Sequence, residues 1–199
     1  MNFNNAIAIT GGIASGKSTV CNLLKLYGYS IIDTDSIAHK ALESSKEAII
    51  KAFGDEILES PLKINRKKLG EIVFKNKAKL ALLESILHPQ IRKEVNLQAQ
   101  RLESQKILYF IDIPLFFELK ARGDGYEIPR VLLVYTPRET QLKRMQKRDN
   151  LSVESATLRL NNQMDIELKR QRSTFIIENT SDIKSLQKQV EEFLKSLCK

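Results

Sequence analysis

A glycine-rich segment near the N-terminus has the composition and spacing of a phosphate-binding loop. Residues 11–18 read GGIASGKS and match the pattern G-x-x-x-x-G-K-[ST]. The apolar run Ala6–Ile9 precedes them and a helical pattern follows, which is the strand-to-helix context that such a loop requires. Glycines let successive N–H groups turn toward an anion, and the start of the helix adds the positive end of its dipole. The segment therefore predicts a site for the phosphates of a nucleoside triphosphate.

The side chains of this loop suit phosphoryl transfer. Lys17 is placed to reach the β- and γ-phosphates, the Ser18 hydroxyl to ligate Mg²⁺, and Thr19 to contact the α-phosphate. ATP is therefore the expected co-substrate, Mg²⁺ the expected metal, and a small soluble kinase the expected class. The expected nucleotide contacts in this segment are Gly12, Ile13, Ala14, Ser15, Gly16, Lys17, Ser18 and Thr19.

Two aspartates follow the second apolar run of the chain, at Asp33 and Asp35. A carboxylate at this position can accept the proton of an acceptor hydroxyl, and we expect the run Ser30–Asp33 to form a strand beside the loop strand. In an extended chain, alternate residues face the same side, so both carboxylates would converge on one substrate group. The alternative is that Asp35 caps the helix that follows, and the residues alone leave both interpretations open.

The third apolar run ends in Asp112, which resembles a Walker-B carboxylate that holds Mg²⁺ through water. Asp112 also precedes Pro114 closely, so a role as a turn residue is the alternative.

Basic residues are concentrated between Arg138 and Arg172, where nine Lys and Arg face five Asp and Glu. Arg144 and Arg148 are four residues apart, hence on one helical face, and Arg159 follows. Guanidinium groups on a closing segment would stabilise charge on the transferred phosphoryl group and exclude water from it. The alternative is a solvated surface whose arginines pair with Glu154 or Asp149.

The elements that must position these residues alternate between strands and helices, which predicts an α/β fold. Continuous apolar runs suit parallel strands that are covered on both faces. We expect a three-layer P-loop kinase fold in a single domain with a five-stranded parallel sheet. The expected strands are 6–9, 30–33, 107–111, 131–135 and 175–177; the expected helices are 18–26, 35–53, 66–87, 89–104, 137–147, 153–172 with a break, and 182–197.

Long connections divide this single domain into a core and two insertions. The core is expected at 1–35, 105–137 and 173–199, a helical substrate-binding insert at about 36–104, and a lid at about 138–172. Within the insert, His88-Pro89 interrupts a helical stretch, because proline disfavours helix in the residue before it. We therefore expect two helices to meet there at an angle.

Composition excludes several other classes of protein. The 199 residues are 42% hydrophobic and 28% charged, which is typical of a folded globular chain. No apolar run approaches the roughly 20 residues that span a bilayer, and no signal-type segment opens the chain, so we expect a cytoplasmic protein without membrane contact. Cys21 and Cys198 have no metal-binding spacing, and we expect no structural metal.

The formal net charge of +8 attracts anions, which include both nucleic acids and phosphorylated metabolites. A nucleotide-regulated nucleic-acid-binding protein is thus a second hypothesis. The chain has no RNP-like aromatic string, no zinc spacing and no N-K-x-D motif, so the charge is its only support. We expect a small-molecule partner rather than nucleic acid, and a monomer or weak homo-oligomer.

Taken in order, the motifs resemble the bacterial dephospho-CoA kinases, which catalyse the last step of coenzyme A synthesis, over nearly the whole chain. The matching segments are 10–19 (TGGIASGKST), 32–35 (IDTD) with Ala38-His39, 69–74 (LGEIVF), 87–89 (LHP), 112–118 (DIPLFFE), Gln141 through Arg144 to Arg148-Asp149, and 177–179 (IEN). Individually most strings are weak, whereas jointly, at these spacings, they are specific. Small departures occur at Phe116-Phe117, Asn65 and Thr174.

The resemblance implies transfer of the ATP γ-phosphoryl group to the ribose 3′-hydroxyl of dephospho-CoA, which gives CoA and ADP. By the same resemblance, Asp35 would be the general base, and Lys17 and Arg148 would stabilise the transferred phosphoryl group. Arg144 would belong to the ATP site and Asn179 would lie near the adenine. The residues expected in the acceptor site are Asp33, Asp35, His88, Arg92 and Glu118. A kinase for another nucleoside or nucleotide is the nearest alternative among enzymes.

Overall fold

A computed structural model describes residues 2–60 and 63–197 of the chain. Its contacts divide the chain into two compact units. The first unit comprises the residues up to Ile32 together with those from Arg101 onward, and the second comprises Asp33–Gln100. Cys198, one of the two cysteines, lies outside the described residues.

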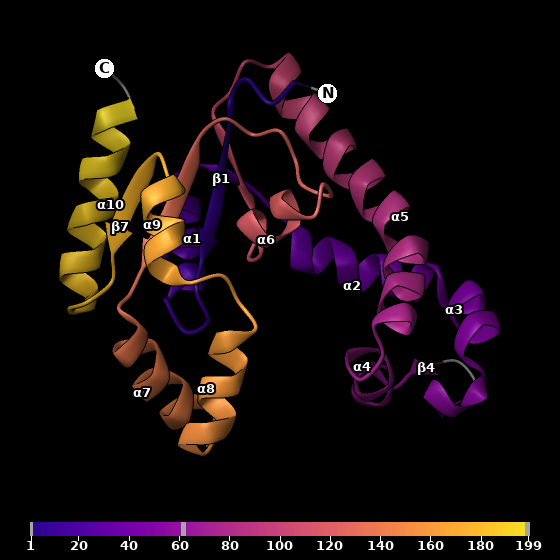
Figure 1. Cartoon of the computed structure of the whole chain (residues 1–199). Helices are drawn as coiled ribbons and strands as arrows, with labels where there is room; N and C mark the ends of the chain where they lie inside the picture. Colours follow the sequence, from indigo (N-terminus) through magenta and orange to yellow (C-terminus); the bar gives the residue numbers. More distant parts are fainter. Residues whose placement is uncertain (1, 61–62, 198–199) are drawn as a thin grey trace. The chain divides into compact units, whose positions relative to one another are not determined.

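A five-stranded sheet forms the centre of the first unit, and Figure 1 labels two of its strands, β1 and β7. The strand order is β2-β5-β1-β6-β7. The pairs β1·β5, β1·β6 and β6·β7 are parallel, and the predicted α/β fold with a parallel sheet is confirmed. In this register Ile9 lies opposite Asp112, and Gly11 lies opposite Val134. The strands are β1 (Ala6–Gly11), β2 (Ser30–Asp33), β5 (Tyr109–Asp112), β6 (Val131–Tyr135) and β7 (Phe175–Glu178).

The predicted position of the second strand beside the loop strand is wrong, because β5 lies between β2 and β1. Burial explains the order. All residues of β5 are buried, as an interior strand requires, whereas Ser30 at the start of β2 is exposed and Ile31 is half-buried, as suits an edge. The acidic residue that ends the strand next to the phosphate loop is therefore Asp112.

Helices cover both faces of this sheet. On one face, α1 and α10 pack against Phe110, Leu132 and Val134, and on the other, Ile166 of α9 packs against Leu133 and Tyr135. The helices of the first unit are α1 (Lys17–Leu26), α6 (Phe116–Ala121), α7 (Arg138–Asp149), α8 (Val153–Asn161), α9 (Ile166–Arg172) and α10 (Ile183–Leu197). The break predicted within 153–172 is confirmed between α8 and α9, while α6 was not predicted.

The second unit is mostly helical and has its own apolar core. Ile49, Phe53, Leu69 and Leu83 pack together in this core. Its elements are α2 (Thr34–Ser44), α3 (Lys46–Phe53), the 3₁₀ turn η1 (Asp55–Ile57), the hairpin strands β3 (Leu58–Ser60) and β4 (Lys63–Ile64), α4 (Arg66–Phe74) and α5 (Lys77–Ser104), which continues into the first unit. The helix predicted over 35–53 is therefore two helices. Asn65 caps α4 by accepting the Lys68 N–H at 3.0 Å, as aspartate would.

The predicted helix junction at His88-Pro89 is wrong. One helix, α5, continues through Pro89, and the break lies earlier, between Phe74 and Lys77. An interior proline removes one backbone hydrogen bond and crowds the preceding turn, at about 3 kcal/mol or more. Leu83 and Val95 are buried on either side of Pro89, and this packing stabilises the continuous helix.

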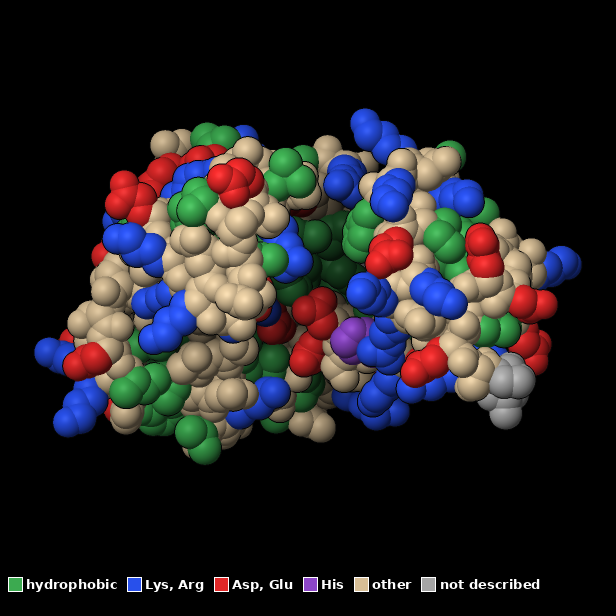
Figure 2. Space-filling model, turned by 90° about the horizontal axis from the view of Figure 1, so that it is seen from below, with side chains coloured by type: hydrophobic (Ala, Val, Ile, Leu, Met, Phe, Trp, Pro, Cys, Tyr) green, Lys and Arg blue, Asp and Glu red, His purple; other side chains and the backbone are tan. Residues whose placement is uncertain are grey.

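Charged side chains of both signs share the surface. On the face seen in Figure 2, Lys and Arg side chains are interspersed with Asp and Glu rather than gathered into one basic stripe. A stripe of one sign would be typical of nucleic-acid binding. Within the described part of the chain, no helix combines the length and the apolar character needed to cross a bilayer.

Candidate active site

The segment between β1 and α1 has the backbone of an anion-binding corner. The central strand β1 ends at Gly11, and α1 begins at Lys17 directly after Gly16. Gly16 has a left-handed backbone (φ 86°), as has Ala14 (φ 58°), and the Ser15 N–H donates to the Gly12 carbonyl at 3.1 Å. These turns bring the chain from the strand into the first turn of α1, whose free N–H groups and dipole attract an anion.

At two glycines of the loop, any other residue would have to displace a neighbouring polar side chain. A Cβ on Gly12 would be 2.3 Å from Gln141 Oε1, and a Cβ on Gly16 would be 2.1 Å from Asn179 Nδ2. Close packing thus favours glycine at both positions, and the left-handed backbone favours it at Gly16 as well.

Polar groups from β6 and the end of β7 fix the outer turn of the loop. The Ser15 carbonyl accepts hydrogen bonds from Asn179 Nδ2 at 2.8 Å and from the buried Thr136 hydroxyl at 3.1 Å. Arg144 of α7 donates in turn to the Asn179 carbonyl at 3.0 Å, and Gln141 donates to the Thr136 carbonyl at 2.7 Å. With its carbonyl held outward, the Ser15–Gly16 peptide keeps a fixed orientation before any ligand binds.

The hydroxyl group of Ser15 is a second polar feature of the loop. Its hydroxyl oxygen is buried and makes no hydrogen bond within the described part of the chain. A buried hydroxyl without a partner is unfavourable by about 1–3 kcal/mol. An oxygen-rich ligand such as a phosphate would satisfy it.

Lys17 and Asp112 form an ion pair at the mouth of the loop. The register of β1 and β5 accounts for it, since Asp112 lies opposite Ile9 at the end of the neighbouring strand. Cys21, one turn along α1, approaches the second carboxylate oxygen with its sulfur at 3.5 Å. Burial, reinforced by the Asp112 charge, raises the pKa of the Cys21 thiol to about 12, so the thiol stays protonated and can donate to Asp112.

Oxygen donors suited to Mg²⁺ occur in this region. Ser18 is exposed in the first turn of α1, and Asp112 contributes carboxylate oxygens. The described residues contain no group of three or more His, Cys, Asp or Glu arranged to hold a metal by themselves. A hydroxyl and one carboxylate fit Mg²⁺, which keeps several waters and takes further oxygens from substrate phosphates.

The predicted arginines have different partners. Arg144 turns toward Asn179, as described above, whereas Arg148 makes two hydrogen bonds with Asp149, at 2.7 and 2.9 Å. Arg159 of α8 lies 3.7 Å from the same carboxylate. The hydrogen bond from Arg148 lowers the pKa of Asp149. Arg148 and Arg159 thus pair with Asp149, as the alternative of a solvated, ion-paired surface predicts. We call Arg148, Asp149 and Arg159 the arginine cluster; it joins α7 to α8.

Asp33 rather than Asp35 caps the helix after β2. The Asp33 side chain accepts the Ser36 N–H at 2.9 Å, and α2 already begins at Thr34. The chain is thus not extended through Asp35, so the premise that alternation places both carboxylates on one side is wrong. Asp35 is exposed in the first turn of α2. Helix capping therefore does not explain why an aspartate stands at position 35.

The remaining predicted acceptor residues lie in separate places. His88 is half-buried and Arg92 exposed, four residues apart on one side of α5 in the second unit. Glu118 is in α6 of the first unit, where it accepts the Met164 N–H at 2.9 Å and lies 2.7 Å from Nζ of Lys169. Its second oxygen is buried and has no hydrogen-bond partner among the described residues.

Some residues of the site were not singled out from the sequence. Thr136 and Gln141 hold the outer turn of the loop, Gln163 bonds the Ile13 N–H, and Lys169 pairs with Glu118. Gln141 stands within one of the family-like strings, so a signal existed for it. The other three are single polar or basic residues without a spacing pattern.

Replacing Gly16 with Ala is expected to lower stability more than the same change at Gly28, which provides a matched control. Both glycines have a positive φ, 86° and 88°, but a Cβ at Gly28 would have no described residue within 4 Å apart from its chain neighbours. Gly28→Ala should therefore show only backbone strain, about 1 kcal/mol, or a loss of roughly 2–4 °C in Tm. In Gly16→Ala the added Cβ must also displace the Asn179 side chain, so the loss of Tm should be larger. Equal Tm values for the two variants in thermal unfolding would contradict the close packing.

The sequence matches the model of the family "Dephospho-CoA kinase" over residues 5–185. A dephospho-CoA kinase from Helicobacter hepaticus is 48% identical over 192 residues, which cover 96% of this chain and 92% of that protein. A dephospho-CoA kinase from Helicobacter pylori strain J99 is 48% identical over 197 residues, or 99% of this chain and 100% of that protein.

Solved structures that resemble this chain include a dephospho-CoA kinase. A dephospho-CoA kinase from Campylobacter jejuni has a TM-score of 0.73 at 38% identity, covering 97% of this chain and 96% of that one. The protein TT1252 from Thermus thermophilus has a TM-score of 0.83 at 35% identity, covering 96% and 97%. A shikimate kinase from Acinetobacter baumannii, at 17% identity and a TM-score of 0.52, covers 98% and 93% and supports the fold alone.

Proposed function

The chain belongs to the dephospho-CoA kinase family, and from this premise we propose how its residues transfer a phosphoryl group to dephospho-CoA. The reaction passes the ATP γ-phosphoryl group to the ribose 3′-hydroxyl and gives CoA and ADP. The observation that carries this function is the corner between β1 and α1, with its fixed Ser15 carbonyl, its unpaired Ser15 hydroxyl and Lys17 at its mouth.

On the nucleotide side, we assign the phosphates to backbone N–H groups of the segment 12–19, apart from the Ile13 N–H, which donates to Gln163, and the Ser15 N–H, which donates to Gly12. Lys17 neutralises the charge that develops between the β- and γ-phosphates, and its pairing with Asp112 holds the ammonium group near that position. Arg148 stabilises the transferred group once it exchanges Asp149 for phosphate, and Arg144 and Asn179 border the nucleotide. The support for Arg144 and Asn179 is that both already bond to the loop or to each other.

Mg²⁺ belongs to this proposal as the partner of the triphosphate. Ser18 and Asp112 would hold it, directly or through water, and it would neutralise charge on the β- and γ-phosphates. Lys17 and the loop amides would add to this neutralisation and hold the same oxygens in place.

On the acceptor side, Asp35 is the proposed general base. It lies in the first turn of α2, two residues after the end of β2, and Asp33 already supplies the helix cap. A base must come within about 2.6–3.2 Å of the proton that it removes. Asp33, His88, Arg92 and Glu118 are the other proposed acceptor residues, although the contacts of Glu118 with Lys169 and Met164 favour an orienting role for it.

The test is whether ADP release depends on the acceptor. Purified protein with ATP and Mg²⁺ should release ADP at a low rate, and addition of dephospho-CoA should raise that rate by at least 100-fold, in line with tight suppression of transfer to water. If adenosine, AMP or shikimate stimulates release and dephospho-CoA does not, the substrate assignment fails. Tight, salt-sensitive binding of DNA or RNA at physiological salt would favour the nucleic-acid hypothesis instead.

We further propose a cytoplasmic location and a monomer or weak homo-oligomer.

A further inference from the structure

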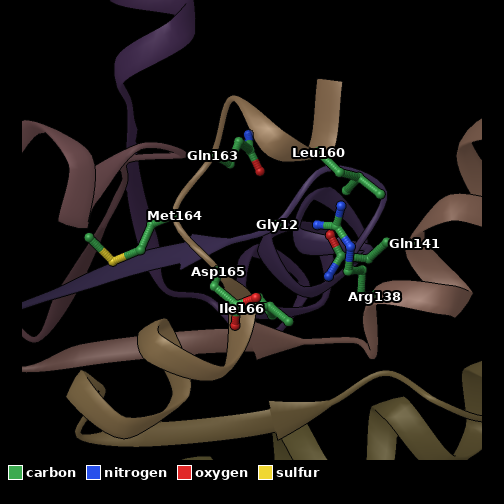
Figure 3. A pocket seen from close by; sticks show the side chains of 8 residues that line it. All are labelled: Gly12, Arg138, Gln141, Leu160, Gln163, Met164, Asp165 and Ile166. Carbon is green, nitrogen blue, oxygen red and sulfur yellow. The ribbon is translucent and has the colours of Figure 1, made fainter. Parts of the chain in front are cut away.

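The segment between α8 and α9 is bonded to the phosphate loop by a side chain from far along the sequence. Gln163 Oε1 accepts a hydrogen bond from the Ile13 N–H at 3.0 Å. Figure 3 shows Gln163 on this segment, close to Gly12 and to Arg138 and Gln141 of α7. The cavity that these residues line measures only about 10 Å³, which is room for about one water molecule, so the segment packs closely against the loop.

The next residue bonds the same segment to a second element. The Met164 N–H donates to Glu118 Oε1 of α6 at 2.9 Å. Glu118 also lies 2.7 Å from Nζ of Lys169, which is fully buried in the first turns of α9. A buried lysine needs its counterion, so Glu118 cannot leave this position without exposing an unpaired charge to an apolar environment. Residues 163 and 164 are therefore attached on one side to the phosphate loop and on the other to α6.

These two bonds lie just beyond the end of α8, the helix that contributes Arg159 to the arginine cluster of Arg148, Asp149 and Arg159. Helix α8, which carries Arg159, ends at Asn161, two residues before Gln163. Its buried residues Ala156 and Leu160 pack against Met145 of α7 and also against Ile13 of the loop. Apolar packing alone is not directional, whereas the hydrogen bond from Ile13 to Gln163 sets both distance and orientation.

We propose that Gln163 is a positioning residue for phosphoryl transfer: by accepting the Ile13 N–H, it holds α8 and the arginine cluster at a set distance from the phosphate loop. This inference rests on the proposed function, because it assigns the arginines to the transferred phosphoryl group. Gln163 need not touch either substrate. Its loss should reduce the rate of transfer rather than the affinity for nucleotide.

Gln163→Met tests the proposal, because methionine has a similar length and volume but only a weak acceptor. We expect kcat with dephospho-CoA to fall about 10-fold or more, KM for ATP to change less than threefold, and Tm to stay within a few degrees. Hydrogen exchange at the Ile13 amide should become faster. The matched control is Gln171→Met, an exposed glutamine of α9, which should leave kcat, KM and Ile13 exchange unchanged.

Gln163→Glu provides the rescue, because its carboxylate can still accept the Ile13 N–H. We expect slow Ile13 exchange and a kcat within about threefold of the parent enzyme, while KM for ATP rises because a negative charge now lies beside the phosphates. This separation of kcat from KM would not arise if position 163 served folding alone.

Three results would overturn the proposal. One is a Gln163→Met enzyme with faster Ile13 exchange and unchanged kcat. Another is a loss of kcat that matches the loss of folded protein, and the third is a Gln163→Glu enzyme with slow exchange whose kcat is as low as that of Gln163→Met. A parent enzyme without acceptor-dependent ADP release would instead refute the proposed function, so the two failures are distinguishable.

Discussion

Asp35→Asn is expected to lower kcat by roughly 10²–10⁴-fold while the dissociation constant for ADP changes less than threefold. Asparagine has nearly the shape of aspartate but cannot remove a proton from the acceptor hydroxyl. The cap of α2 comes from Asp33, so the helix start survives the substitution. Steady-state kinetics with dephospho-CoA, together with ADP titration, measure the two effects separately.

Two further variants show whether this loss is specific. Glu47→Gln is the matched control, since Glu47 is exposed at the second position of α3 as Asp35 is at the second position of α2, and it interacts similarly with the helix dipole. Its kcat should remain within twofold of the parent enzyme. Asp33→Asn keeps the cap, because asparagine caps as well as aspartate. A larger kcat loss for Asp33→Asn than for Asp35→Asn would move the base to Asp33.

Lys17→Met is expected to weaken both ATP binding and phosphoryl transfer. We expect kcat to fall by roughly 10²–10³-fold and the affinity for ATP by about 10-fold or more. The lysine interacts with the phosphates before transfer and with the developing charge during it. A normal ATP affinity together with a normal turnover number would contradict the assigned position of Lys17. Lys25→Met, an exposed residue in the last turn of the same helix, should leave both quantities unchanged.

Stability must be separated from catalysis in this variant. Removal of Lys17 leaves the largely buried Asp112 carboxylate without its ion-pair partner, which should lower the free energy of unfolding by about 1–3 kcal/mol. In the double variant Lys17→Met/Asp112→Asn, Tm should recover in part, because the carboxylate charge that Lys17 neutralises is removed together with the lysine. Activity should not recover. If the double variant regained turnover, the lysine would be required only to neutralise Asp112.

The fold was largely predictable because apolar runs and glycine positions report directly on buried strands and turns. The apolar run 6–9 lies within β1 (Ala6–Gly11), and the apolar run 131–135 coincides with β6 (Val131–Tyr135). Their order was not predictable, because the runs that form β2 and β5 look alike in composition. Only the burial of the whole of β5 against the partly exposed β2 distinguishes the interior strand from the edge strand.

The candidate site was predictable where residue spacing reflects a mechanism, and not where it depends on tertiary contacts. The phosphate loop has a fixed pattern, so its residues could be named. The sequence indicates a cap at Asp35, whereas Asp33 supplies it, because both aspartates are good cap residues and only the structure shows where the helix begins. Gln163 and Lys169 carry no local pattern at all, and their partners Ile13 and Glu118 are distant in sequence.

The continuous course of α5 through Pro89 has a similar cause. Proline disfavours helix locally, and that preference is all that the sequence displays. Leu83 on one side of Pro89 and Val95 and Ala99 on the other are buried, so packing outweighs the lost hydrogen bond. Local propensity and tertiary packing disagree here, and packing decides the structure.

A structure of the protein with ADP, Mg²⁺ and dephospho-CoA tests the central claim most directly. The decisive quantities are the contacts of the ADP diphosphate and the distance from the ribose 3′-oxygen to each oxygen of Asp35. We predict a diphosphate enclosed by the loop of residues 12–19, with the Ile13 amide still bonded to Gln163, and an Asp35 oxygen within about 3.2 Å of the 3′-oxygen. A diphosphate bound elsewhere, or a 3′-oxygen that contacts neither Asp35 nor Asp33, would contradict the account.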